Sequence, residues 1–157
     1  MVVDMEIDLV TAVQLAGLAL TTETLRRLRA AGHPDLRTSH GYLIQHVIEG
    51  PRPVGEIAAR MGVTQQAVSK SVGELVRLGY LERDPAVDDA RVRLIGLSDH
   101  GRAAVAATRR IRVEVEAELA ATLGADRAAA LHDAALAAVE WAGGGDSMRS
   151  RRVPEPT

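Results

Sequence analysis

The chain contains no cysteine and no phenylalanine, and aromatic residues make up only 2% of its 157 residues. Without cysteine, disulfides, thiolate metal sites, cysteine-based redox sensing and a cysteine nucleophile are excluded. The scarcity of aromatic residues argues against a fold that reads single-stranded nucleic acid by stacking bases on aromatic side chains. Positive charge is not in excess either, because the chain has 21 acidic residues and 19 lysine and arginine residues. The net charge of −2 excludes a polybasic nucleic-acid binder but leaves room for a small basic patch.

The sequence also lacks long hydrophobic runs. No stretch of about 18 apolar residues is present that could span a bilayer. The acidic N-terminal residues are unlike the basic start of a signal peptide. We therefore expect a soluble cytoplasmic protein, and the 46% of hydrophobic residues is enough for one compact domain with a buried core.

Helical periodicity dominates what is present. Apolar residues recur at helical spacing, and glycine or proline interrupts the pattern between the periodic segments. Helices are expected over residues 7–30, 38–49, 54–61, 65–78, 99–123 and 127–142. We expect Thr64, Ser98 and Asp126 to cap the helices that follow them, because their side chains can accept from free backbone N–H groups.

The helical pattern breaks once, after residue 79. Extended runs over 80–83 and 91–97 flank a segment rich in turn residues, which predicts a two-stranded hairpin with a polar tip. The predicted fold is therefore mainly α with a small β-hairpin wing.

A single domain over residues 1–157 has room for distinct parts. The first helix and the alanine-rich C-terminal helices carry more apolar surface than a small monomer needs, which favours a helical bundle between subunits. We expect dimerisation helices over 7–30 and 98–142, a winged-helix lobe over 38–97, and a disordered polar tail over 143–157.

The helices over 54–61 and 65–78 have helix-turn-helix spacing. Ala58 is small enough for the two helices to cross closely, and Gly62 can adopt the positive φ that the turn needs. Val68 is placed to lock the second helix onto the first. Together with the following hairpin, these residues predict a winged helix.

The second of these helices leaves a polar face outward once its apolar face is removed. Its N-terminal end, where a recognition helix touches bases, is rich in side chains that can bind bases or phosphates. The outward residues are Thr64, Gln65, Gln66, Ser69, Lys70 and Arg77. A solvated polar face without DNA is the alternative interpretation, but two adjacent glutamines and the chain's one lysine favour DNA contact.

Three sequence blocks, in this order and spacing, resemble the MarR family of winged-helix transcriptional regulators. They are VGEIAARMGVTQQAVSKSVGELVRLGYLER, DDARVRLIGLS and LSDHGRA. The second is similar to the family's Asp-x-Arg wing, and the third to the start of its long fifth helix. The resemblance covers about residues 11–142.

The resemblance implies a role for individual residues. Thr64 to Lys70 and Arg77 would lie in or beside the major groove. Arg91 would be the wing arginine that enters the minor groove, and Asp89 the acid that orients it, a pairing that suits a narrow groove of negative potential. An ordinary Asp–Arg hairpin pair is the alternative.

The resemblance also implies a homodimer joined through its N- and C-terminal helices. Such a dimer would read a pseudo-palindromic double-stranded operator with two recognition helices. Family members are most often repressors, and many are released by small phenolic or acidic ligands bound between the DNA-binding lobe and the dimer helices. No cofactor is expected.

Candidate ligand contacts lie on the first, second and long helices. Polar or basic side chains there could bind an organic acid, although His and Tyr often serve structure and the arginines have Glu114 and Glu116 nearby as partners. The candidates are Gln14, His40, Tyr42, His46, Arg109 and Arg112. A metal site is not expected unless histidines of different lobes or subunits converge.

Other classes of function remain to be weighed. Ser98, Asp99 and His100 are consecutive at a helix start, so they point apart and cannot form a catalytic relay. No phosphate-binding loop or paired-carboxylate signature is present either, and we expect no enzyme. The alternatives are a winged helix that contacts proteins without DNA, and a zinc-responsive regulator of the MarR type.

Overall fold

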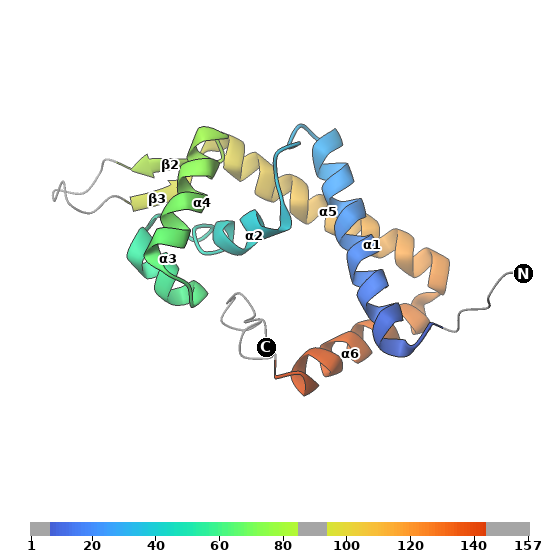
Figure 1. Cartoon of the computed structure of the whole chain (residues 1–157). Coiled ribbons are helices and arrows are strands. Elements are labelled where there is room, and N and C mark those ends of the chain that lie inside the picture. Colours follow the sequence, from blue (N-terminus) through green and yellow to red (C-terminus); the bar gives the residue numbers. More distant parts are fainter. Residues whose placement is uncertain (1–6, 85–93, 144–157) are drawn as a thin grey trace, which may run out of the picture.

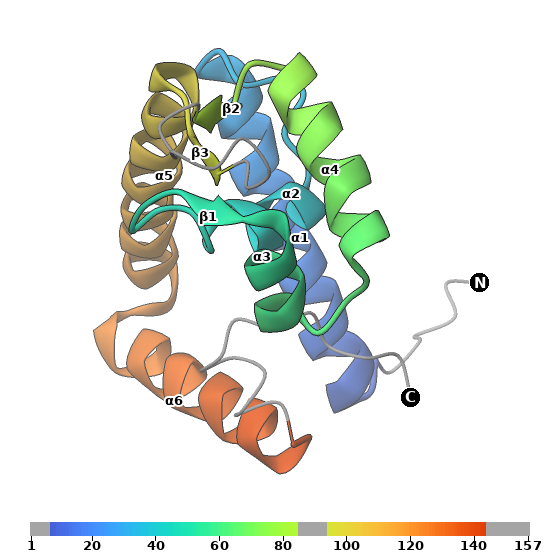
Figure 2. The same ribbon diagram turned by 90° about the vertical axis from the view of Figure 1, so that its left-hand side faces the viewer.

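The computed structural model describes residues 7–84 and 94–143. Two long helices, α1 (Leu9–Ala30) and α5 (Asp99–Leu123), lie side by side, and α6 (Ala125–Trp141) crosses the end of the molecule near the start of α1 (Figures 1 and 2). A lobe of shorter elements lies beside this pair. It contains α2 (Thr38–Ile44), α3 (Val54–Met61), α4 (Gln65–Arg77) and a small sheet.

The sheet is the part of the fold that differs most from expectation. It has three antiparallel strands in the order β1-β3-β2, where β2 (Leu81–Asp84) and β3 (Leu94–Leu97) carry the wing. The extra strand, β1 (Arg52–Pro53), pairs with β3 in the register Arg52↔Ile95. The prediction of a two-stranded hairpin was therefore incomplete.

Helix termini follow the capping rules at two of the three expected positions. The Thr64 side chain accepts from the N–H of Ala67, and the Ser98 side chain accepts from the N–H of Gly101. The expectation for Asp126 was wrong, because α6 begins after Gly124 and Asp126 already lies in its first turn. An acidic residue there still interacts favourably with the helix dipole.

The helix expected over 38–49 is shorter than predicted. It ends at Ile44, and residues 45–49 form turns in which the N–H groups of His46 and Val47 bond three residues back. Val47 is still buried, so the apolar pattern continues although the helix does not.

The core of the lobe is apolar and continuous. Its most buried members come from every helix of the lobe, from the turn before β2 and from β3. They are Leu43, Val47, Ile57, Val68, Val72, Leu75, Tyr80 and Ile95. α5 joins this core at its start, where a Cβ on Gly101 would lie 2.0 Å from the Tyr80 carbonyl oxygen.

A second, smaller cluster joins α1 to α5. Leu28, Ala107 and Ile111 are buried there, with Leu25 and Val115 packed against them. The rest of α1 and all of α6 are far more open. Leu9 is 79% exposed and Trp141 is 90% exposed, and no residue of α6 is buried.

None of the helices formed by the described residues is long and apolar enough to cross a membrane. The expected tail lies outside the described residues except for Gly143, and so does the tip of the wing with Asp89 and Arg91.

Candidate nucleic-acid interface and cavity

The α3–α4 unit has the geometry of a helix-turn-helix. Gly62 adopts a φ of 69°, the left-handed conformation that the turn needs. Ala58 and Val68 are 3% and 1% exposed, so the helices meet at the small residue and the β-branched residue that the sequence predicted.

The two faces of α4 differ sharply in polarity. Val68, Val72 and Leu75 are buried against the lobe. All of the residues expected to meet DNA from this helix are exposed: Thr64, Gln65, Gln66, Ser69, Lys70 and Arg77. The side chain of Gln65 rests against α3, with its amide nitrogen 3.1 Å from where a Cβ on Gly55 would stand.

The charges on this face are arranged so that some cations stay available. Arg60 of α3 is paired with Glu56 at 2.9 Å. Lys70 and Arg77 form no salt bridge with any other residue that the structure describes. These two cations can therefore meet phosphates without first breaking an ion pair.

An ion-pair network ties the opposite side of α4 to α2. Arg37, at the start of α2, binds the Glu74 carboxylate, and its Nη2 lies 2.9 Å from Nε2 of His40. His40 is 3% exposed, and burial, followed by the Arg37 charge, lowers the pKa of its imidazole. The pKa of Glu74 is also lowered: partial burial works against this shift, but Arg37 and His40 outweigh it. The lowered pKa favours the neutral imidazole of His40, and in the tautomer that leaves Nε2 unprotonated this nitrogen accepts from Arg37.

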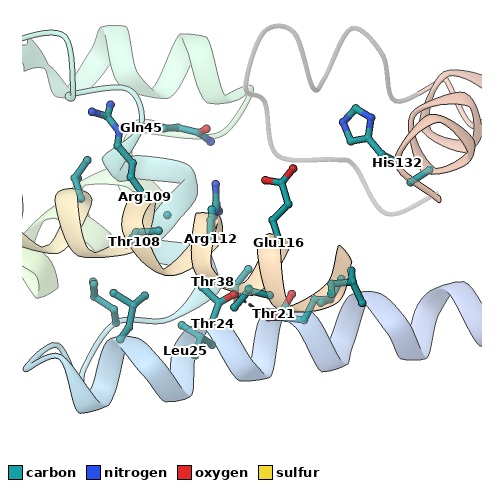
Figure 3. Close-up of a pocket in the computed structure, with 18 of the residues that line it drawn as sticks. Thr21, Thr24, Leu25, Thr38, Gln45, Thr108, Arg109, Arg112, Glu116 and His132 are labelled. Atoms are coloured by element: carbon teal, nitrogen blue, oxygen red, sulfur yellow. Dashed lines mark hydrogen bonds between the residues drawn. The ribbon is translucent and has the colours of Figure 1, made fainter. Parts of the chain in front are cut away.

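A cavity of about 1340 Å³ lies between α1, α2, α5 and α6 (Figure 3). Apolar residues such as Leu25, Ile44 and Val115 form much of its wall. Arg109 and Arg112 also line it, and in Figure 3 both side chains extend from α5 into the space beside α2. Within the described part of the chain, neither arginine forms a salt bridge. This wall can accept an apolar body that carries an acid group.

Only some of the ligand contacts predicted from the sequence line this cavity. Tyr42, Arg109 and Arg112 line it. Gln14 is exposed on the first half of α1, away from the lining. His40 and His46 are buried in the lobe and are not among the lining residues.

Comparison with known proteins finds a family model that matches part of the chain. Residues 35–92 match the sequence profile of the MarR family. The uncharacterized HTH-type transcriptional regulator ML2140 of Mycobacterium leprae is 32% identical to this chain over 87 residues. These residues make up 55% of this chain and 61% of that protein, so the chain spans less than two thirds of this relative. The uncharacterized HTH-type transcriptional regulator Mb0904 of Mycobacterium bovis is 29% identical over 132 residues, 84% of this chain and 91% of that protein. In residues 35–92 the chain is thus similar to the MarR family.

Solved structures share the MarR winged-helix fold. RV1404 from Mycobacterium tuberculosis superimposes with a TM-score of 0.70 at 20% identity, over 83% of this chain and 90% of that chain. The transcriptional repressor CouR, solved on a 23-mer DNA duplex, gives a TM-score of 0.62 at 24% identity, over 85% of this chain and 92% of that chain. At these identities the likeness concerns the fold alone.

The curated relatives named above are transcriptional regulators, which are not enzymes. Among the residues that the structure describes, no group of three histidine or acidic side chains could hold a metal ion.

Sequence reasoning missed the contact between Arg37 and Glu74. The two residues are 37 positions apart in the chain, so no local pattern joins them. Only the packing of α2 against α4 brings them together.

Proposed function

We propose that this chain is a sequence-specific, double-stranded DNA-binding transcriptional regulator that acts as a homodimer. The observation that carries the proposal is the exposed polar face of α4, with Gln65, Gln66, Ser69 and Lys70 at the end that a recognition helix presents to bases. A winged helix built only for protein contact has no need for a lysine and two adjacent glutamines at this end of the helix.

The experiment begins with duplexes that the protein itself selects from a random pool. Fluorescence anisotropy then measures the affinity of the wild type and of Gln66→Ala for the selected and for an unrelated duplex. We expect Gln66→Ala to lose about tenfold on the selected duplex and little on the unrelated one, because a base contact carries specificity. Arg110→Ala, which removes an exposed arginine from α5, is the matched control.

The wing is tested on the same duplexes. Arg91→Ala should weaken binding by at least about tenfold, because a minor-groove arginine is held by the negative potential of the groove. If both Gln66→Ala and Arg91→Ala leave the affinity for selected DNA unchanged, the interpretation as a protein-contact module takes precedence.

The dimer is part of the same proposal. Large apolar side chains are exposed along the first half of α1 and on α6, including Leu9, Val10, Leu18 and Trp141. Water-exposed apolar surface of this extent usually marks an interface. A two-fold dimer would hold two α4 helices about 34 Å apart, one turn of DNA, and would read a pseudo-palindrome.

We further propose that the regulator is a repressor released by a small organic acid. The support is the cavity between the lobe and the long helices, which Tyr42 of α2 lines together with Arg109 and Arg112. Neither arginine forms a salt bridge with another described residue. The cavity is larger than the roughly 300–1,000 Å³ of ordinary ligand pockets, so the acid would occupy part of it. Release from DNA would be a shift between competent and incompetent spacings of the two lobes.

A further inference from the structure

The Arg37–Glu74 pair belongs to two sites at once. Glu74 lies on α4, on the side turned toward α2, while Arg37 lies at the start of α2. Arg37 and its neighbour Thr38 also line the cavity. One residue therefore contacts the helix proposed to read DNA and also lines the space proposed to hold an acid.

Both side-chain hydrogen bonds of Arg37 to described residues use the same guanidinium nitrogen, Nη2. Nη2 carries two hydrogens, one directed to Glu74 Oε1 and one to His40 Nε2 at 2.9 Å. Its Nε and Nη1 donate to no other described residue. Nη2 is thus the atom through which Arg37 holds α4.

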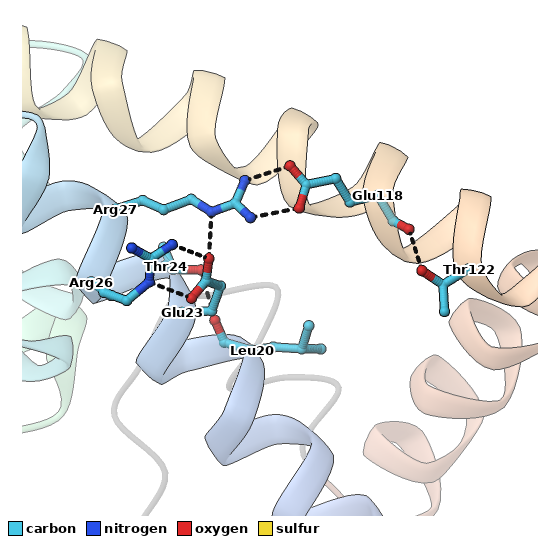
Figure 4. Close-up of polar contacts among 7 residues, drawn as sticks. All are labelled: Leu20, Glu23, Thr24, Arg26, Arg27, Glu118 and Thr122. Atoms are coloured by element: carbon cyan, nitrogen blue, oxygen red, sulfur yellow. Dashed lines mark hydrogen bonds and ion pairs between the residues drawn. The ribbon is translucent and has the colours of Figure 1, made fainter.

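A carboxylate that binds an arginine with both oxygens must use Nη2. Figure 4 shows the two possible geometries in this molecule: Arg26 binds Glu23 through Nε and Nη2, and Arg27 binds Glu118 through Nη1 and Nη2. Bidentate pairs are the strong and specific ones. An acid that takes Arg37 in this way competes for the two Nη2 hydrogens that now go to Glu74 and His40, and Glu74 is the charged competitor.

We propose that Arg37 is an exchange residue, which leaves Glu74 for the carboxylate of an apolar acid in the cavity and thereby releases α4 from α2. This inference rests on the proposed effector site and adds the residue pair through which that site acts. Glu74 would then keep His40 and the charge of Arg77 nearby, with its side chain 34% exposed and its hydrogen-bonded cationic partner gone. α4 loses a fixed connection to α2, and its affinity for DNA falls.

Thermodynamic reciprocity gives the proposal a measurable form. If the acid and Glu74 compete for Arg37, the ion pair between Arg37 and Glu74 weakens acid binding by a certain factor. Removing the charge of Glu74 must then strengthen acid binding by the same factor. The side chain of Arg37 is 59% exposed, so solvent screening limits the effect to a few-fold.

The test uses the full chain and two probes, 2-naphthoate and the uncharged 2-naphthamide, with dissociation constants from isothermal titration calorimetry. We expect Glu74→Gln to bind 2-naphthoate about threefold more tightly than the wild type, with no change for 2-naphthamide. Arg37→Gln should weaken 2-naphthoate binding, and adding Glu74→Gln to it should bring no gain. Glu56→Gln is the matched control, because it breaks ion pairs of α3 to Arg52 and Arg60 outside the cavity lining.

The outcomes separate this inference from the proposed function. If both probes bind and Glu74→Gln leaves the ratio of their affinities at the wild-type value, the exchange is wrong and the effector site stands. If neither probe binds the folded wild type, the effector site is wrong and the exchange falls with it. Cooperative thermal unfolding of each variant, recorded first, ensures that a loss of binding is not a loss of fold.

Discussion

At the scale of single residues, Gly101 carries the tightest steric constraint. It lies at the start of α5, where a Cβ would stand 2.0 Å from the Tyr80 carbonyl oxygen. We expect Gly101→Ala to lower the free energy of unfolding by about 2–4 kcal/mol, because α5 must move away from the lobe to admit one methyl group. Gly41→Ala is the control in α2, since nothing lies within 4 Å of its added Cβ. Urea unfolding measures both, and equal changes would contradict the close approach.

Beside Gly101, three rings meet where α1, the lobe and α5 join. His33 is 5% exposed and its Nδ1 has no partner among the described residues. Its ring centroid is 4.8 Å from that of His100, and His100 stacks on Tyr80 at 4.6 Å. Burial, and then the charge of His100, lowers the pKa of His33 below its ordinary value of 6.5. Folding therefore favours the neutral form of the His33 imidazole over its protonated form.

This lowered pKa predicts how stability changes with pH. Below about pH 6.5 the unfolded chain binds a proton that folded His33 refuses, so stability falls as the pH decreases toward the folded pKa. His33→Phe should make the loss of stability between pH 7.5 and 5.5 shallower, although His40, whose pKa is also lowered, leaves a residual slope. His132→Phe, at an exposed site on α6, should keep the wild-type slope. Urea midpoints across this range measure the difference, and parallel curves for wild type and His33→Phe would exclude the assignment.

At the scale of elements, the sequence predicts what local chemistry decides. The bounds of α3 and α5 agree with expectation because their ends carry local signals: the prolines before Val54, the positive φ of Gly62 and the Ser98 cap. The α4 face could be predicted for the same reason, since its period separates buried from exposed residues. β1 could not, because a two-residue strand is defined only by its partner Ile95 far along the chain.

The cavity and the arginine pair were beyond prediction for a related reason. Tyr42, Arg109 and Arg112 were found because polar residues on otherwise apolar helices are noticeable in a sequence. Arg37 and Glu74 look like ordinary surface charges, and their meaning comes from the packing of α2 on α4. His40 and His46 were singled out by residue type, yet burial in the lobe separates them from the cavity.

The α1–α5 seam leads to an element-scale prediction. Ala107 is 6% exposed and lies against Leu28 and Ile111, whereas Ala106, the residue before it, is exposed. We expect Ala107→Leu to destabilise the fold by about 1–3 kcal/mol, because the added carbons overfill a seam of small residues. Ala106→Leu adds the same atoms to an exposed position and should change the free energy of unfolding little. Thermal unfolding distinguishes the two, and similar midpoints would mean that the helices can separate without cost.

At the scale of the whole molecule, the distribution of buried residues is uneven. The lobe has its own apolar core, while α6 buries no residue and the first half of α1 exposes its large apolar side chains. One chain therefore completes the core of the winged-helix lobe but leaves its long helices partly uncovered. A second copy that covers α1 and α6 would supply what is missing and fix the distance between two recognition helices.

Val13 on α1 provides the test of this arrangement. Its side chain is 51% exposed, and at 3.6 residues per turn it shares a face of the helix with Leu9 and Leu20. Val13→Glu would bury a charge in the proposed interface, so we expect it to convert a dimer into a monomer in multi-angle light scattering. The affinity for selected operator DNA should fall as well, because two separate monomers then bind the two half-sites independently. Ala19→Glu adds the same charge about 120° away around the helix and should remain dimeric. A wild-type chain that scatters as a monomer at every concentration would overturn the two-half-site mechanism and leave the winged helix to act alone.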